Sequence, residues 1–386
     1  MRIILFTGKG GTGKTTTAAA TALEAASRGY KTLVISTDPA HSLSDALDIE
    51  LGPEPVNITE NLDGQEFDIY YSMKKYWGNM RQLMKTIITW QGVRDVVAEE
   101  MSVLPGMEQA SAFLWLEQHY TENKYDLLVI DSAPTGETLS LLTLPESTKS
   151  WMNRAFPLMK TAIKSFMAIL RRITKVPVDQ GYEEFEQMFR KLDRIHQAFT
   201  DPSITSIRIV TNPEKMVISE AKRSYTHLQM YGYNVDAVVV NRILPEVSGN
   251  GLFKQYREDQ KRYLEEIEES FNPLPIFRVN HLGHEAFGID LMRQIGKEMY
   301  RDEDPARIYF QEKPMEIQDL EDRYEVRLKV PFLDSGKFTL NKFGDEIVLE
   351  VNSRRKRLYL PRFANFLELS GYRREDSWLV VELKKK

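Results

Sequence analysis

The sequence of 386 residues contains no cysteine, which excludes disulfide bonds, cysteine-ligated zinc and thiol catalysis. Its six histidines are scattered and do not show the spacing of a metal site. No apolar run reaches the roughly 18 residues that a membrane-spanning helix needs. The chain enters an apolar segment at Arg2, which leaves no room for a targeting peptide. We therefore expect a cytoplasmic protein that is at most peripheral to a membrane.

Strong charge of either sign is also lacking. The formal net charge is −5, which argues against a nucleic-acid partner. Hydrophobic residues make up 42% of the chain and charged residues 28%, values that are typical of globular proteins with a sizeable core. The length allows one large domain or two.

The most informative stretch lies at the N-terminus. Arg2–Phe6 is an apolar run that suits a buried parallel strand. Gly8–Thr15 then fits the phosphate-binding pattern G-x-x-x-x-G-K-[ST], and the small-residue segment Thr17–Ala26 predicts a helix. A glycine-rich turn that precedes a helix by chance is the alternative, but the flanking strand and helix supply the context that the motif requires.

This loop predicts binding of ATP and Mg²⁺. Its glycines allow successive backbone N–H groups to face the phosphates at the start of a helix. Lys14 would reach the β- and γ-phosphates, and the hydroxyl group of Thr15 would hold Mg²⁺. The predicted phosphate-binding residues are Gly8, Lys9, Gly10, Gly11, Thr12, Gly13, Lys14, Thr15 and Thr16.

Two further apolar strands end in aspartate at positions that would face the loop. Lys31–Thr37 is followed by Asp38, which could orient or deprotonate the attacking water. Tyr125–Asp131 ends on an aspartate that suits a second Mg²⁺ contact. Pro134 and Gly136 follow, and the glycine would let the backbone approach the γ-phosphate. The alternative for both aspartates is a simple turn at a strand end.

The loop with its early lysine resembles the deviant phosphate loop of the ParA/MinD/ArsA group. The stretches that begin at Ser36 and at Asp131 further resemble the switch loops of the ArsA family, which comprises arsenite-pump ATPases and ATPases that guide tail-anchored membrane proteins. The resemblance implies water activation by Asp38, magnesium binding by Asp131, and a homodimer in which Lys9 reaches the nucleotide of the partner.

The resemblance also implies how the base is bound. Asn241 follows the apolar segment 235–240, and it matches the asparagine that reads adenine in the family. An amide can pair with both a donor and an acceptor on the adenine edge, although an asparagine in a turn is the alternative. We also place Asn212, which follows the strand expected at 204–211, among the nucleotide-binding residues.

A helical insertion is predicted at about 73–116 and 145–200. Eight of the 15 methionines lie between residues 73 and 167, and flexible methionines suit a surface that accepts varied apolar helices. Targeting members of the resembled family bind hydrophobic segments in this region, whereas ordinary packing of a helical subdomain is the alternative. The predicted client-binding residues are Met152, Phe156, Met159, Ile163, Phe166, Met167 and Leu170.

The composition changes at 301–314, which we interpret as a linker that follows a first domain at 1–300. Beyond it every second residue of several segments is apolar, the alternation that is typical of strands. This pattern predicts a small antiparallel β-sandwich at 315–386. This pattern resembles the α-crystallin-like domain of some members of the family. The predicted fold is therefore α/β: a P-loop NTPase with a mostly parallel sheet flanked by helices, followed by the sandwich.

These features favour a homodimeric Mg²⁺-dependent ATPase that couples ATP binding and hydrolysis to the binding and release of hydrophobic or transmembrane segments of clients. Targeting of tail-anchored proteins and general chaperone action both remain open, as does a membrane receptor. An oxyanion-pump ATPase and a positioning switch of the MinD/ParA type are the alternatives. Arsenite binding in ArsA uses cysteine thiolates, and this chain has none.

Overall fold

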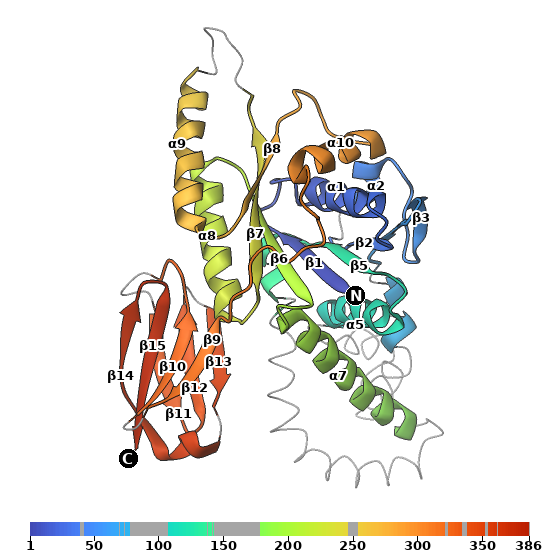
Figure 1. Cartoon of the computed structure of the whole chain (residues 1–386). Helices are drawn as coiled ribbons and strands as arrows, with labels where there is room; N and C mark the ends of the chain where they lie inside the picture. The colour runs from blue at the N-terminus through green and yellow to red at the C-terminus, as the bar shows by residue number, and fades with distance from the viewer. Residues whose placement is uncertain are drawn as a thin grey trace, which may run out of the picture.

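The computed structural model describes most of the chain as two domains with a connecting segment (Figure 1). The described residues are 1–38, 42–68, 70–72, 74–77, 107–136, 138–140, 142, 178–245, 254–320, 323–333, 338–351, 354–360 and 362–385. The seven predicted client-binding residues lie between positions 143 and 177, outside the described residues, and their role stays a prediction.

The N-terminal domain is built on an eight-stranded sheet of order β3-β4-β2-β5-β1-β6-β7-β8. All neighbouring strands are parallel except the pair β3 and β4 at one edge. In chain order the strands are β1 (Arg2–Thr7), β2 (Thr32–Ser36), β3 (Val56–Thr59), β4 (Leu62–Glu66), β5 (Leu127–Asp131), β6 (Thr205–Thr211), β7 (Val235–Ile243) and β8 (Ile276–Asn280).

Helices cover both faces of this sheet, which is why its central strands are continuous apolar runs. In β1, Ile3 and Leu5 belong to one buried cluster, and Ile4 and Phe6 belong to the other. One face carries α1 (Lys14–Ser27), α2 (Ser42–Leu47) and α10 (Ile289–Tyr300), and the other carries α5 (Met107–Glu122), α7 (Val178–Thr200), α8 (Lys215–Met230) and α9 (Lys254–Phe271).

The ends of the predicted insertion are part of this core. Phe113 and Trp115 of α5 are buried against the sheet, as are Ile195 and Phe199 of α7. Residues 110–116 and the second half of α7 therefore pack in the core. None of the helices within the described ranges is long and apolar enough to cross a membrane.

The C-terminal domain consists of two antiparallel sheets, which confirms the predicted fold. One sheet has the order β14-β15-β10-β9 and the other the order β11-β12-β13. Alternating side chains such as Val326, Leu349 and Val381 are buried between them. The strands are β9 (Met315–Asp319), β10 (Tyr324–Lys329), β11 (Phe338–Phe343), β12 (Glu346–Val351), β13 (Arg354–Tyr359), β14 (Leu367–Glu375) and β15 (Trp378–Lys385), with the short helix η1 (Arg362–Phe366).

The connection between the domains packs on the N-terminal sheet. Arg208 is completely buried, pairs with Asp236 at 3.3 Å, and donates a hydrogen bond to the carbonyl oxygen of Pro305 at 2.9 Å. Asn234 likewise donates to the carbonyl oxygen of Phe310 at 3.0 Å. A buried charge with several partners fixes the path of the chain, so the predicted linker is not a free tether at these positions.

Candidate functional site

The phosphate-binding loop follows the central strand β1 and leads directly into α1. Gly8 must be glycine because a Cβ there would lie 2.2 Å from the carbonyl oxygen of Val210. Gly13 has a φ of +90°, and its Cβ would lie 2.0 Å from Nδ2 of Asn241. The loop is closed internally by Thr12, whose hydroxyl group donates to the carbonyl oxygen of Lys9 at 2.8 Å.

The first turn of α1 is suited to an anion. Gly13 occupies the N-cap position and offers no side-chain cap, and no acidic residue lies in the first turn. The backbone N–H groups at the start of the helix and its dipole therefore favour a phosphate. Lys14 is buried at this end, whereas Lys9 is exposed on the loop.

Thr15 and Asp131 meet at the carboxyl ends of the strands. The hydroxyl group of Thr15 donates to Oδ2 of Asp131 at 2.8 Å and lies 3.1 Å from the hydroxyl oxygen of Ser42. Ser36 also donates to Oδ2 of Asp131, at 3.3 Å. Helix α1 and strand β2 thus each place a hydroxyl group against the carboxylate at the end of β5. No role was predicted for Ser36 or Ser42, although Ser36 begins the stretch that resembles a switch loop.

The carboxylate of Asp131 fits a divalent cation. It is completely buried, and its Oδ1 has no hydrogen-bond partner among the described residues. Burial raises the pKa of Asp131 to about 7, an effect opposed by the hydrogen bond from Thr15 and by the charge of Lys14. A buried carboxylate oxygen without a partner, next to a threonine hydroxyl, is a donor set that Mg²⁺ prefers.

Asp38 lies beside this group. It follows β2 and is half-buried, and its backbone N–H donates to the hydroxyl oxygen of Ser36 at 3.3 Å. Its charge is one of those that raise the pKa of Asp131, so the two carboxylates are electrostatically close. The structure therefore brings Lys14, Asp38 and Asp131 into one site, as predicted from the strand ends.

The loop after β5 is attached to the phosphate-binding loop. The backbone N–H of Thr135 donates to the carbonyl oxygen of Gly8 at 3.3 Å. A Cβ on Gly10 would lie 4.0 Å from Cγ of Pro134, so the two loops touch. Gly136, by contrast, faces open space among the described residues. Gly136 is exposed at this point of the loop.

Two asparagines support the same loop from β6 and β7. Nδ2 of Asn241 donates to the carbonyl oxygen of Thr12 at 2.9 Å, and its Oδ1 accepts from the backbone N–H of Arg242 at 2.8 Å. The side-chain amide of Asn212 is oriented so that its oxygen and its nitrogen both find suitable partners. In this orientation its nitrogen donates to the same Thr12 oxygen at 3.2 Å. This supporting role was missed from the sequence. One N–H and one lone pair of Asn241 remain for a base, so adenine reading stays a prediction.

A mostly parallel sheet with a phosphate-binding loop after its central strand, and a hydrogen bond from Thr15 to the buried Asp131, define a P-loop ATPase. Residues 1–301 match the family of anion-transporting ATPases, ArsA, and residues 321–383 match the HSP20-like domain found in ArsA. The chain belongs to the ArsA family of ATPases. The family and the fold class expected from the sequence are therefore confirmed.

Two relatives align with nearly the whole chain, and a third aligns with about three quarters of it. The chain is 36% identical over 396 residues to "Putative arsenical pump-driving ATPase 1" of Aquifex aeolicus, with 99% of each chain covered. It is 37% identical over 386 residues to a similarly named protein of Chlorobaculum tepidum, covering 99% of this chain and 95% of that one. It is also 28% identical over 313 residues to "ATPase ASNA1 homolog" of Entamoeba dispar, covering 77% and 93%.

Proposed function

We propose that two copies of this chain hold ATP between them, and that hydrolysis of the nucleotide controls the binding and release of hydrophobic protein segments. The observation that carries the first part is the contrast between the two lysines of the loop. Lys14 is buried beside Asp131, where it can serve the nucleotide of its own subunit. Lys9 is exposed on the rim of the same loop, where a second copy could be reached.

Magnesium is part of this proposal. Thr15 and Asp131 would hold the ion, and Asp38 would orient the attacking water next to it. When bound, Mg²⁺ neutralises charge that develops on the phosphate oxygens. The chain's own residues do the rest: the loop backbone and Lys14 bind the phosphates, and the bond from Thr135 to Gly8 fixes the second loop against the first.

The choice of client rests on two features. The names of the relatives from Aquifex and Chlorobaculum point to an arsenical pump, but a chain without cysteine lacks the thiolates that bind arsenite in ArsA. The methionine-rich segment at 152–170 instead favours apolar helices as ligands. The HSP20-like domain supports general chaperone action as a second candidate.

A defined peptide tests the proposal. The Asp38→Asn variant, loaded with ATP and Mg²⁺, should bind a fluorescent peptide that carries an apolar run of about 20 residues, the length of a transmembrane helix. The ADP-loaded protein should release it. Met159→Asp should weaken binding, and Lys160→Asp, its neighbour off the predicted apolar face, should not. Equal binding in both nucleotide states would contradict the proposal, and preference for an unfolded soluble protein would favour the chaperone.

A further inference from the structure

Strand β13 of the C-terminal domain lies against the turn between α8 and β7. Nζ of Lys356 is buried 3.5 Å from the carbonyl oxygen of Tyr231 and 5.4 Å from the centre of its ring. In return, the hydroxyl group of Tyr231 donates to the carbonyl oxygen of Arg355 at 3.3 Å. These reciprocal contacts, made partly through the backbone, fix the register of β13 on the N-terminal domain.

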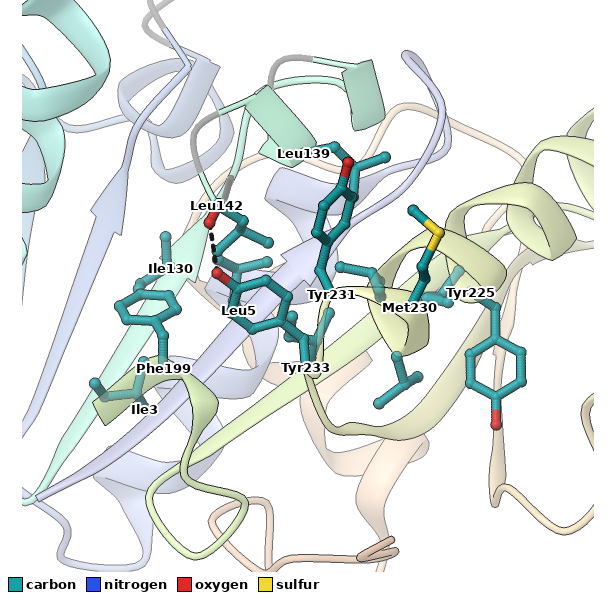
Figure 2. Packing of buried hydrophobic residues seen from close by; sticks show 14 of the residues in the cluster. Ile3, Leu5, Ile130, Leu139, Leu142, Phe199, Tyr225, Met230, Tyr231 and Tyr233 are labelled. Atoms are coloured by element: carbon teal, nitrogen blue, oxygen red, sulfur yellow. Dashed lines mark hydrogen bonds between the residues drawn. The ribbon is translucent and has the colours of Figure 1, made fainter. Parts of the chain in front are cut away.

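The same turn also carries the segment that follows β5. The hydroxyl group of Tyr233 donates to the carbonyl oxygen of Leu142 at 2.5 Å. Leu139 and Leu142 are buried in the same cluster as Tyr231 and Tyr233, and Figure 2 shows these side chains above the central strands. The α8–β7 turn is therefore in contact with β13 on one side and with the segment after the β5 loop on the other.

Arg354 connects β13 directly to the loop after β5. Its Nη2 lies 3.5 Å from the carbonyl oxygen of Gly136, at the long end of the hydrogen-bonding range. Gly136 follows Thr135, whose N–H is bonded to Gly8 of the phosphate-binding loop. The guanidinium group of Arg354 in the C-terminal domain thus faces the Gly136 carbonyl group, which lies directly after the residue bonded to the phosphate-binding loop.

We propose that Arg354 is a positioning residue for ATP hydrolysis: its guanidinium group holds the Gly136 carbonyl outward, so that the backbone of this loop faces the terminal phosphate. The C-terminal domain then takes part in the ATPase reaction through this contact. A change of the bound nucleotide that moves the loop would also change the backbone stability of β13. The inference rests on ATP binding at the proposed site and on the approach of the Gly136 backbone to the γ-phosphate that the sequence predicts. It does not depend on the client or on the dimer.

Steady-state kinetics of the full chain without client peptide test the positioning role. Arg354→Ala should lower kcat by about threefold to tenfold while KM changes by less than about twofold, because coupling through one contact has this size. Arg354→Lys, which keeps the cation, should restore most of the turnover. Arg355→Ala is the matched control, since that side chain is exposed and pairs only with Glu350 among the described residues, at 3.3 Å. An unchanged or raised kcat in Arg354→Ala would overturn the proposal.

Backbone hydrogen exchange tests the coupling separately from turnover. In the wild-type protein, replacing ADP by a non-hydrolysable ATP analogue with Mg²⁺ should change the exchange of amides in β13. In Arg354→Ala this difference should vanish in β13 and persist in the phosphate-binding loop. A wild-type β13 that exchanges equally with both nucleotides, or a difference that survives the substitution, would overturn the coupling even if ATP binding is normal.

Discussion

The hydroxyl group of Thr15 and the carboxylate of Asp131 form a 2.8 Å hydrogen bond across 116 positions of sequence. The bond joins the first turn of α1 to the end of β5. The other oxygen of the same carboxylate, Oδ1, has no hydrogen-bond partner in the described part of the chain. Because a buried carboxylate is costly without a compensating cation, this pair is the most direct structural support for a metal site.

Replacement of Asp131 by asparagine should therefore weaken Mg²⁺ binding. The variant loses the negative charge and one metal-binding oxygen, and we expect the Mg²⁺ requirement for ATP hydrolysis to rise by at least about tenfold. A titration of ATPase activity with Mg²⁺ measures this. Asp126→Asn, an exposed aspartate at the start of the same strand segment, is the control. Identical Mg²⁺ dependence in wild type and Asp131→Asn would remove Asp131 from the metal site.

The Asp38→Asn variant should keep nucleotide binding and lose hydrolysis. An amide cannot accept a proton from water, and loss of a general base or orienting carboxylate lowers turnover by about 10²- to 10⁴-fold. Calorimetry of ATP binding and phosphate release measure the two effects. Asp45→Asn, an exposed aspartate on the neighbouring helix α2, should behave as wild type. Normal turnover in Asp38→Asn would rule out the assignment.

The Gly13→Ala variant should bind nucleotide poorly. The added methyl group would lie 2.0 Å from Nδ2 of Asn241 and would displace the amide that holds the Thr12 carbonyl. The positive φ of Gly13 adds strain. We expect ATP affinity to fall by about tenfold or more, as for loss of one well-placed interaction. Gly52→Ala, with nothing within 4 Å of the new methyl group among the described residues, should leave affinity unchanged.

The sequence predicted the parts of the site that are carried by local motifs. The loop from Gly8 onward and the aspartates at the ends of β2 and β5 are recognisable because each follows an apolar strand. The support of the loop by Asn212 and Asn241 could not be predicted, since it depends on β6 lying next to β1 and on β7 lying next to β6, an order that no local pattern states.

In the fold, too, local patterns were predicted from the sequence and long-range packing was not. Strands such as β10 and β15 were predicted from strict alternation, but β3 and β4 were missed because their sequences are short and polar. The packing of α5 on the sheet was also missed: its evenly distributed apolar residues do not separate a core helix from an insertion. The contact of Arg354 with Gly136 joins residues 218 positions apart and required the structure.

A buried histidine at the domain interface predicts a pH dependence of stability. His227 of α8 is buried, and burial together with the charge of Arg354 lowers its pKa from about 6.5 to about 4. The folded protein keeps the imidazole neutral where the unfolded chain binds a proton. The free energy of unfolding should therefore fall as the pH drops from about 6.5 to about 4.

Thermal unfolding at pH 7 and at pH 5 measures this effect. In His227→Gln the decrease in Tm between the two values should be smaller than in wild type, because a glutamine does not titrate. His284→Gln, at an exposed position, should retain the wild-type decrease. Equal decreases in wild type and His227→Gln would show that this side chain does not contribute.

In the proposed dimer each nucleotide is served by residues of two chains, and a mixture of two inactive variants tests this sharing. Lys9→Ala removes the lysine proposed to act across the interface, and Asp38→Asn removes the carboxylate proposed to act within the subunit. In a dimer formed from one chain of each kind, one site keeps Asp38 of its own chain and Lys9 of the other.

The measurement is the ATPase rate of an equimolar, re-equilibrated mixture of the two variants. Random pairing in a two-fold symmetric dimer gives about a quarter of all sites an intact set of residues, so we expect a rate near one quarter of wild type. A mixture that remains at the mean of its two parents would contradict the shared site.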